Sequence, residues 1–263
     1  MLELKIRYSL ELKIRYSISE DMLEKIKEIE EKLSIIHIEE QNKKINISTK
    51  SRVRSVYSSL AIEDNPLSLE AVEKITEDKL VLAKRTDVQE VKNANELYEN
   101  MDNYNYLNEE DFLKAHLLLM KYFEDDNGTY RSHGEGVKKD DEIIFMAPDS
   151  ILVPTFMNNL FTFINENNNS VHPIILSAIF HYYLVYIHPF TDGNGRIARF
   201  WVSLMLRNYN SNFEYIPIEE EIYINKEKYY NAIAESHNNN NANVFIDFML
   251  DIILSSVTKI VSE

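Results

Sequence analysis

The chain has 263 residues, of which 44% are hydrophobic and 27% are charged, so its composition is that of a globular protein with a packed core. The 43 acidic residues outnumber the 28 basic ones, which argues against nonspecific nucleic-acid binding because that binding needs a basic face. The absence of cysteine excludes disulfide bonds, cysteine-ligated zinc and thiol nucleophiles. No apolar run approaches the roughly 18–20 residues of a membrane span, and the first residues do not form a secretory signal. We therefore expect a cytoplasmic protein with no membrane partner.

The N-terminal segment contains an internal repeat. Residues 2–9 recur letter for letter as residues 10–17, with apolar and charged residues in alternation. An alternation of period two predicts a β-strand. A single perfect copy is not a solenoid, and we attribute it to a recent duplication or to an added segment. We expect residues 1–49 to hold this repeat and one helix, and residues 50–263 to form the main domain.

Most of the remaining chain is predicted to be helical, because apolar residues recur at intervals of three and four. The first helix is expected to begin after Ser19, with acidic residues in its first turn. A second helix is expected over residues 50–63. Asn65-Pro66 ends it, because the residue before a proline is pushed out of the α region. Further helices are expected to start after Ser68 and after Asn108, and over residues 87–101, 150–166, 173–187, 196–208, 226–236 and 243–258.

Residues 137–146 break the helical pattern. Two short apolar runs flank a polar, aspartate-rich turn, with Gly136 before them and Pro148 after them. This arrangement predicts a small β-hairpin. The expected fold is therefore mainly α, a helical bundle with one small hairpin.

Residues 188–199 carry the clearest chemical signal. The chain has only five glycines, yet two of them lie in this stretch, which reads His-Pro-Phe-Thr-Asp-Gly-Asn-Gly-Arg-Ile-Ala-Arg. Apolar helices are predicted on both sides, so the segment is a tight loop that leads into a helix N-terminus. Glycines let backbone N–H groups turn inward as an anion-binding nest, and the helix start adds partial positive charge. Arg196 and Arg199 share one helix face and can bind further oxygens.

Two more side chains of this segment have the chemistry of a transfer site. Asp192 offers a hard oxygen ligand for Mg²⁺, and His188 has an ordinary pKa near neutrality, which suits a general base. Together with the nest and the arginines they are typical of phosphoryl or nucleotidyl transfer. A plain turn is the alternative, although the helical flanks disfavour it. An EF-hand is excluded because Arg196 would occupy a ligand position, and the chain has no Walker A sequence.

The pattern His-Pro-Phe-x-Asp-Gly-Asn-Gly-Arg-x-x-Arg is the signature of Fic-domain proteins, and residues 188–199 match every specified position. The resemblance extends over roughly residues 50–260, through Gly128-x-Tyr130-Arg131, Val153-Pro154 and Tyr229-Tyr230. It implies a Fic-type helical bundle whose hairpin is a flap. It also implies transfer of AMP from ATP to a Ser, Thr or Tyr hydroxyl of a target protein, with Mg²⁺ as cofactor.

The same resemblance assigns roles to individual residues. His188 would accept the proton of the target hydroxyl, and Asp192 would hold Mg²⁺ on the phosphates. The other nucleotide contacts would be Gly193, Asn194, Gly195 and Arg196 at the α- and β-phosphates, Arg199 at the γ-phosphate, and Tyr229, Tyr230 and His237 by the adenine. The flap would pair with an extended target chain by strand addition through Ile143, Ile144, Phe145 and Met146. Many relatives carry histidine near Phe145 and proline near Ala147, and this departure concerns target preference.

A second match lies upstream, where residues 58–65 resemble the inhibitory motif Ser/Thr-x-x-x-Glu-Gly/Asn of the family. Ser59 and Glu63 are four residues apart and so lie on one face of the predicted helix. In the family this glutamate pairs with the second motif arginine, here Arg199, and blocks the γ-phosphate site. Asp64 departs from the motif, but aspartate tolerates the left-handed conformation better than most residues. We therefore predict an inhibitory helix at residues 50–65. The alternative is that Glu63 is a solvated carboxylate at a helix end.

The leading hypothesis is a self-inhibited protein adenylyltransferase of bacterial origin, with an unidentified target protein, possible self-modification and a possible homodimer. One alternative is removal of AMP from a modified protein, with Glu63 orienting water. A second is another transfer of the Doc branch, against which the intact Asp192 and Arg199 count. A third is a nucleotide-sensing module without catalysis. His116 and His181 lie in apolar helices and are interpreted as core histidines bonded to backbone.

Overall fold

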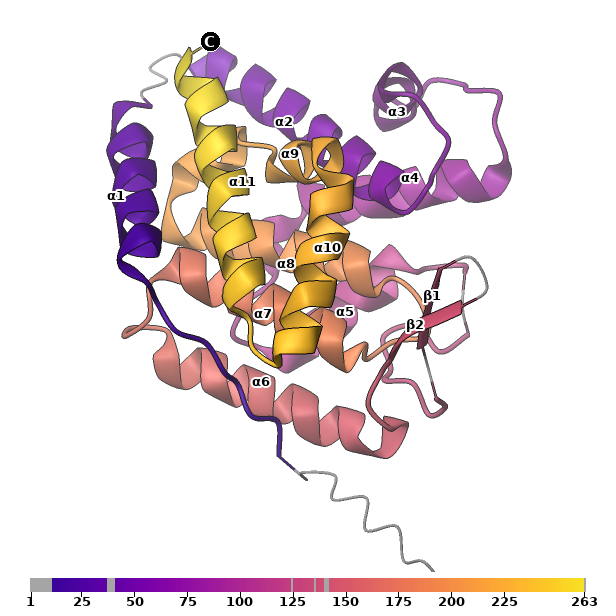
Figure 1. Cartoon of the computed structure of the whole chain (residues 1–263). Coiled ribbons are helices and arrows are strands. Elements are labelled where there is room, and N and C mark those ends of the chain that lie inside the picture. Colours follow the sequence, from indigo (N-terminus) through magenta and orange to yellow (C-terminus); the bar gives the residue numbers. More distant parts are fainter. Residues whose placement is uncertain (1–10, 37–40, 124, 135, 140–141, 263) are drawn as a thin grey trace, which may run out of the picture.

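The structure is a computed structural model that describes residues 11–36, 41–123, 125–134, 136–139 and 142–262. Within these ranges the chain forms eleven α-helices and one antiparallel hairpin (Figure 1), which confirms the prediction of a mainly α fold. The helices are α1 (Glu20–Ile35), α2 (Gln41–Ile62), α3 (Leu69–Thr76), α4 (Arg85–Glu99), α5 (Glu109–Leu119), α6 (Val153–Asn167), α7 (Pro173–Ile187), α8 (Asn194–Tyr209), α9 (Ile218–Ile224), α10 (Lys226–Asn239) and α11 (Asn243–Ser262). The strands are β1 (Gly136–Lys139) and β2 (Glu142–Met146).

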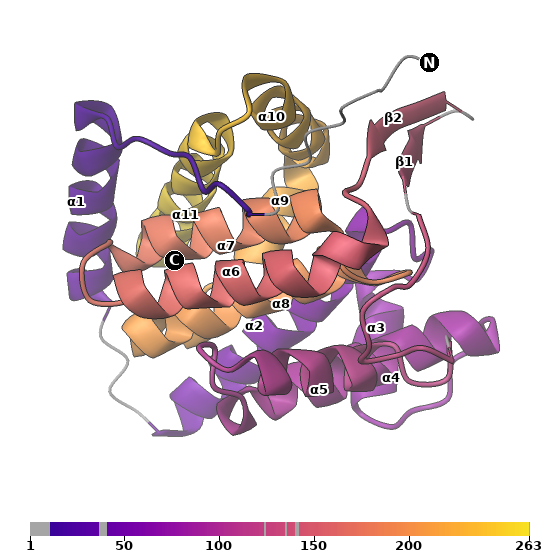
Figure 2. The same ribbon diagram turned by 90° about the horizontal axis from the view of Figure 1, so that it is seen from below.

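The core of the molecule is built around α7. This helix is apolar on every side and is buried along almost its whole length, as expected for a central helix. α6, α8 and α11 pack against it, and Figure 2 shows α6, α7 and α8 side by side. An aromatic cluster joins the layers, with Phe112 and Trp201 packed edge to face at 5.1 Å between ring centroids. The core therefore supports α7 and α8, the two helices that carry the ends of the motif loop.

A buried carboxylate on α9 connects α2, α4, α8 and α9. Glu219 of α9 is fully buried and accepts hydrogen bonds from Ser55 Oγ of α2 (2.6 Å), Tyr98 OH of α4 (2.9 Å) and Ser203 Oγ of α8 (2.6 Å). Three donors compensate for the loss of water around the carboxylate. The network fixes the middle of α2 relative to α8, one helical turn before Ser59.

Residues 11–18 form an N-terminal strap and not the predicted strand. Their period-two pattern is still used, because Leu12, Ile14 and Tyr16 pack against the core while the charged residues between them are exposed. The strap's backbone bonds to side chains and a loop, through Leu12 N to Asn159 Oδ1 (3.2 Å), Arg15 N to Tyr183 OH (2.5 Å) and Ala242 N to Arg15 O (2.9 Å). The first copy of the repeat, residues 2–9, lies outside the described residues.

The predicted helix over residues 50–63 is the C-terminal part of α2, which begins at Gln41. The first turns of α2 are polar, so no apolar periodicity predicted them as helix. Ser48 Oγ donates to Glu214 Oε1 at 2.6 Å and attaches this part of α2 to the bundle. α2 is therefore continuous across residues 49 and 50, where the sequence suggested a domain boundary. The division into two domains stays a prediction.

The predicted hairpin lies at one end of the bundle (Figure 2), where β1 and β2 pair with Gly136 opposite Met146 and Lys139 opposite Glu142. The register is irregular between Val137 and Lys138. Phe145 anchors β2, because its ring lies 4.2 Å from the ring of His237 and 5.8 Å from that of Tyr186. No helix in the described part of the chain is both long and apolar enough to cross a membrane.

Candidate active site

The motif loop connects α7 to α8 and has the predicted form of a tight loop that leads into a helix. His188 ends α7 in a left-handed conformation (φ 50°, ψ 60°), and Gly193 precedes α8 with φ 81°. Asn194 closes the loop, since its Nδ2 donates to Phe190 O (2.8 Å) and its Oδ1 accepts from Phe190 N (3.0 Å). The Asn194 side chain is thus buried and bonded inside the loop, and its place at the phosphates stays a prediction.

The side chain of His116 in α5 forms hydrogen bonds to the motif loop and to Gly128. Its Nδ1 accepts from Gly128 N at 3.1 Å, and its Nε2 lies 2.9 Å from Asp192 O. Because a backbone N–H can only donate, the ring proton is on Nε2. The ring stacks on Phe190 at 3.5 Å, and its burial lowers the pKa of His116 to about 4. His116 is therefore a core histidine bonded to backbone, as interpreted from the sequence, and it also holds the loop in place.

Arg131 fixes the other side of the loop. Its guanidinium is buried and donates to four carbonyl oxygens, from Nε to His188 O (2.7 Å), from Nη1 to His133 O (2.7 Å) and from Nη2 to Pro148 O (2.6 Å) and Ile187 O (3.3 Å). A planar fork of donors suits such a convergence of carbonyls. Arg131 therefore joins the end of α7, the backbone of His188 and the exit of the hairpin.

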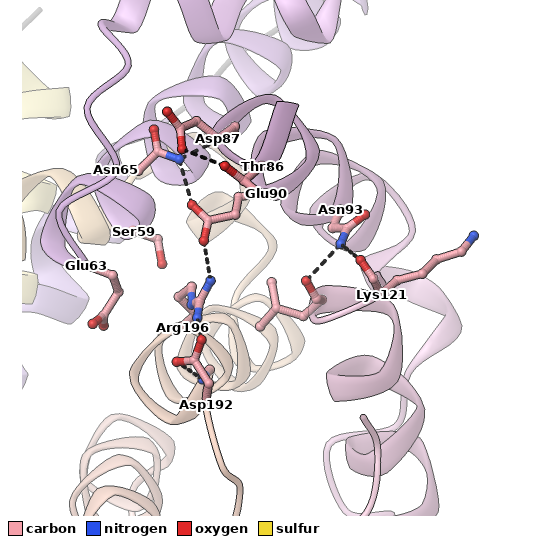
Figure 3. A network of polar contacts seen from close by, with 12 residues as sticks. Ser59, Glu63, Asn65, Thr86, Asp87, Glu90, Asn93, Lys121, Asp192 and Arg196 are labelled. Atoms are coloured by element: carbon pink, nitrogen blue, oxygen red, sulfur yellow. Dashed lines mark hydrogen bonds and ion pairs between the residues drawn. The ribbon is translucent and has the colours of Figure 1, made fainter. Parts of the chain in front are cut away.

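Asp192 and Arg196 form an ion pair at the start of α8. Arg196 Nη2 lies 2.7 Å from Asp192 Oδ2, and Asp192 Oδ1 accepts from Gly193 N at 2.6 Å (Figure 3). Desolvation favours the neutral acid, but the charge of Arg196 and these hydrogen bonds outweigh it and lower the pKa of Asp192. The carboxylate is therefore ionised at neutral pH, and its side chain is 56% exposed.

The surroundings of Asp192 bear on the predicted cation site. The part of the chain that the structure describes holds no group of three or more His, Asp or Glu side chains that could bind a metal ion. Mg²⁺, however, usually takes one or two carboxylates together with substrate phosphates and water. An exposed, ionised Asp192 at the N-terminal end of α8 fits that kind of site.

Arg199 contacts both residues of the upstream motif. Its Nη2 donates to Glu63 Oε1 (2.8 Å) and to Ser59 O (2.9 Å), and its Nε donates to Ser59 Oγ (3.1 Å). Arg199 is fully buried, yet the charge of Glu63 overcomes desolvation and raises the pKa of the guanidinium. The alternative of a merely solvated Glu63 is wrong, because the carboxylate has a buried cationic partner 136 residues away.

The Glu63 carboxylate also lies against the first turn of α8. A β-carbon on Gly195 would be only 2.4 Å from Glu63 Oε1 and 3.0 Å from Arg199 Nη1. The carboxylate is thus an anion at a helix N-terminus, where the helix dipole and free N–H groups favour negative charge. Asp64 follows with φ 64°, the left-handed conformation for which the family motif uses glycine or asparagine.

The residues predicted to lie by the adenine occupy different surroundings. Tyr229 is 1% exposed, and its hydroxyl lies 2.9 Å from Nε2 of the buried His181. Tyr229 is thus a buried residue near Arg199, and burial raises its pKa to about 12; its place by the adenine stays a prediction. Tyr230 of α10 is 43% exposed, and its hydroxyl lies 3.4 Å from Ile62 O at the end of α2.

His237 lies between the hairpin and α7, in contact with the rings of Phe145, Tyr182 and Tyr186. Burial and the nearby His188 lower the pKa of His237 to about 4. Of the predicted flap residues, Phe145 is half-buried and Met146 is exposed. The side chains of Ile143 and Ile144 lie outside the described residues.

The structure thus brings Ser59 and Glu63 to the end of α8 where the motif loop delivers Asp192, Arg196 and Arg199. Sequence analysis missed the contacts of four residues with this site. His116 and Arg131 bond to the loop, Glu90 lies 3.1 Å from Arg196, and Asn65 donates to Glu90 at 2.7 Å. A charged or polar residue on an amphipathic helix is normally solvated, so the sequence carried no signal for Glu90. For Arg131 the signal was present, since the Gly-x-Tyr-Arg element was part of the resemblance.

The fold and the site define a helical protein in which a glycine-containing loop leads from His188 to the start of a helix that carries Arg196 and Arg199. The profile of the Fic/DOC family matches residues 106–206. The crystal structure of a Fic family protein from Desulfovibrio desulfuricans G20 is 36% identical, covers 95% of this chain and 77% of that one, and superposes with a TM-score of 0.90. The chain therefore belongs to the Fic/DOC family.

Other relatives are more distant. A Fic domain containing signaling protein from Bacteroides thetaiotaomicron shares the fold, with a TM-score of 0.78 at 23% identity over 90% of this chain and 96% of that one. The protein adenylyltransferase Fic of Nematostella vectensis is 28% identical over 72% of this chain and 45% of its own length. A probable protein adenylyltransferase of Aquifex aeolicus is 28% identical over 68% of this chain and 52% of its own length. The chain spans about half the length of these two curated relatives.

Proposed function

We propose that this protein is a protein adenylyltransferase that is held inactive by its own α2 helix. The observation that carries the proposal is the position of the Glu63 carboxylate, 2.8 Å from Arg199 and against Gly195. A nest and two guanidinium groups form a polyphosphate site, and the carboxylate occupies the part of it that would take the γ-phosphate. The curated relatives, which are named as adenylyltransferases, support the same activity.

The transfer would use the residues of the motif loop. His188 accepts the proton of the target hydroxyl, and the oxygen forms a bond to the α-phosphorus of ATP. The bond from that phosphorus to its bridging oxygen breaks, and pyrophosphate leaves with the electron pair. The N–H groups of the nest and Arg196 stabilise the charge on the phosphates.

The cation of this reaction would be held by Asp192, which is ionised, together with phosphate oxygens of the nucleotide. Bound Mg²⁺ supplies charge neutralisation at those oxygens. Asp192 would present its Oδ2 to the cation, while its Oδ1 accepts a hydrogen bond from Gly193 N at 2.6 Å. Arg196 must release Asp192 Oδ2 for this, and it keeps a second acidic partner in Glu90, at 3.1 Å.

The target would dock on the hairpin. β1 and β2 form a two-stranded sheet, so each strand has an edge without a partner strand in the described residues. An extended segment of a target protein can add to such an edge through main-chain hydrogen bonds. Phe145 holds β2 close to the end of α7, where His188 lies. The same docking would allow a segment of another copy of the chain to be modified.

The test is incorporation of label from [α-³²P]ATP with Mg²⁺ into protein, in a lysate and in the purified protein alone. Wild type, Glu63→Gly and Glu63→Gly/His188→Ala are compared. Label in the single variant only is expected, because Arg199 is freed and the double variant lacks the base. Nucleotide affinity is measured in parallel, and it should be retained in the double variant because the nest and the arginines remain.

Absence of label in every lane, with nucleotide binding intact, would contradict the proposal. Two other functions would then remain. Glu63 has a 35% exposed side chain, so water reaches it, and it would be able to orient water for removal of AMP. Release of AMP from a labelled protein by wild type, but not by Glu63→Gly, would indicate that activity. Neither transfer nor release would indicate a nucleotide-sensing module.

A further inference from the structure

A second acidic residue joins α2 to the motif loop. Glu90 of α4 contacts Arg196 Nη1 through Oε1 at 3.1 Å and accepts from Asn65 Nδ2 through Oε2 at 2.7 Å (Figure 3). Asn65 lies two residues after Glu63, in the turn that ends α2. One carboxylate therefore bridges the end of α2 and the first turn of α8.

The position of the Asn65 side chain is fixed because both the oxygen and the nitrogen of its amide form hydrogen bonds. Its Oδ1 accepts from Leu67 N at 3.1 Å and so stabilises the turn across Pro66. Its Nδ2 also donates to Asp87 O at 3.3 Å, and its own backbone N donates to Leu60 O at 3.1 Å. The acceptor side of the amide shapes the turn, whereas the donor side holds α4.

Arg196 is the other end of the bridge. Its side chain is 6% exposed and lies between the carboxylates of Asp192 and Glu90, while its buried Nε has no hydrogen-bond partner within the described part of the chain. Two acidic partners compensate for its burial. The orientation of Arg196 is therefore coupled, through Glu90, to the position of Asn65.

We propose that Asn65 and Glu90 form a clamp, in addition to the Glu63–Arg199 contact, that keeps the end of α2 on the first turn of α8. This inference rests on the proposed function where it concerns transfer activity. Glu90 is a positioning residue, because it acts through Arg196 and Asn65. The clamp is separate from the exposed Lys226–Asp64 ion pair at 2.6 Å, which holds the same turn from α10.

The decisive variant is Asn65→Asp. It has nearly the same shape and keeps the acceptor for Leu67 N, but it replaces the amide donor with a carboxylate that faces Glu90. The matched control is Glu99→Gln, which breaks the 3.1 Å ion pair between Glu99 of α4 and Arg52 of α2, away from the site. Should Asn65→Asp fail to fold, Asn65→Ser serves instead, since its short side chain keeps an oxygen near Leu67 but does not reach Glu90.

The first readout is hydrogen–deuterium exchange over residues 58–65. Loss of a hydrogen bond to a charged acceptor changes a local opening equilibrium on the order of tenfold, so we expect exchange to accelerate by that factor in Asn65→Asp and to be unchanged in Glu99→Gln. Unchanged exchange in Asn65→Asp would overturn the clamp, whatever the activity of the protein.

The second readout is label transfer. We expect Asn65→Asp to raise transfer in the chain that keeps Glu63 and to add nothing in Glu63→Gly, because the brake is already absent there. Faster exchange without a rise in transfer, when Glu63→Gly itself is active, would overturn the link between clamp and brake. An inactive Glu63→Gly would refute the proposed function and leave the exchange result to decide the clamp.

Discussion

The contacts of His116 predict how the stability of the fold depends on pH. Its Nδ1 must stay unprotonated to accept from Gly128 N. Burial lowers the pKa of the ring to about 4, although the hydrogen bond to Asp192 O by itself raises that pKa. The unfolded chain has the ordinary histidine pKa near 6.5. Between these two values the unfolded state binds more protons than the folded state. Stability is therefore lost as the pH falls below about 6.5, and the loss levels off below about 4.

The size of the effect follows from the two pKa values. From pH 7.5 to pH 5, His116 alone should reduce the free energy of unfolding by about 2 kcal/mol. The assay is urea denaturation at several pH values in this window, followed by the fluorescence of Trp201, the single and fully buried tryptophan. Wild type is compared with His116→Asn, whose amide oxygen can accept from Gly128 N but does not titrate.

His116→Asn should be less stable than wild type at pH 7.5, and the difference should shrink by about 2 kcal/mol at pH 5. The comparison cancels the contributions of other titrating groups, among them His237, whose pKa is also lowered. Parallel pH profiles of the two proteins would refute the reasoning, because they would mean that His116 is not held neutral by its contacts.

Three further predictions concern single side chains. Arg131→Lys should lower the free energy of unfolding by about 3 kcal/mol in urea denaturation, because one ammonium cannot replace the fork that serves four carbonyls; a loss below about 1 kcal/mol would contradict this role. Glu219→Leu should cost about 3 kcal/mol, since three hydroxyl donors lose their shared acceptor in the core, and full stability would show that water replaces the carboxylate. Gly195→Ala should be destabilising in wild type and about 1 kcal/mol less so in Glu63→Gly, where the space is empty. Additive effects in that double-mutant cycle would mean that the Glu63 carboxylate does not lie on position 195.

Several features of the fold were predictable because their causes are local. The intervals of three and four between apolar residues depend only on helical geometry, and they predicted helices that the structure contains, among them α1, α7 and α11. The hairpin followed from two short apolar runs around a polar turn. The motif loop followed from its glycines, which permit the conformation seen at Gly193, φ 81°. In each case the necessary residues are close together in the sequence.

Other features could not be predicted because they depend on which surfaces meet. The alternation in residues 10–17 is compatible with a strand, yet the described part of it is a strap, since side chains of α6 and α7 supply its partners. An aromatic pair at residues 229–230 suits a ligand or a core equally well, and packing alone buries Tyr229 and exposes Tyr230. Similarly, nothing local distinguishes Glu90 from the other charged residues of α4.

The sequence by itself therefore determined the helical class, the loop with its histidine, aspartate and two arginines, and the candidate partner of Arg199 at position 63. The helical class and the loop depend on short-range spacing and on residue chemistry, whereas the partner of Arg199 is what the resemblance of residues 58–65 to the family's inhibitory motif implies. Only the tertiary structure decided that Glu63 lies against Gly195, that Asn65 and Glu90 connect α2 to Arg196, and that His116 and Arg131 hold the loop. Those contacts join residues far apart in the chain, and a contact of that kind exists only once the helices have packed.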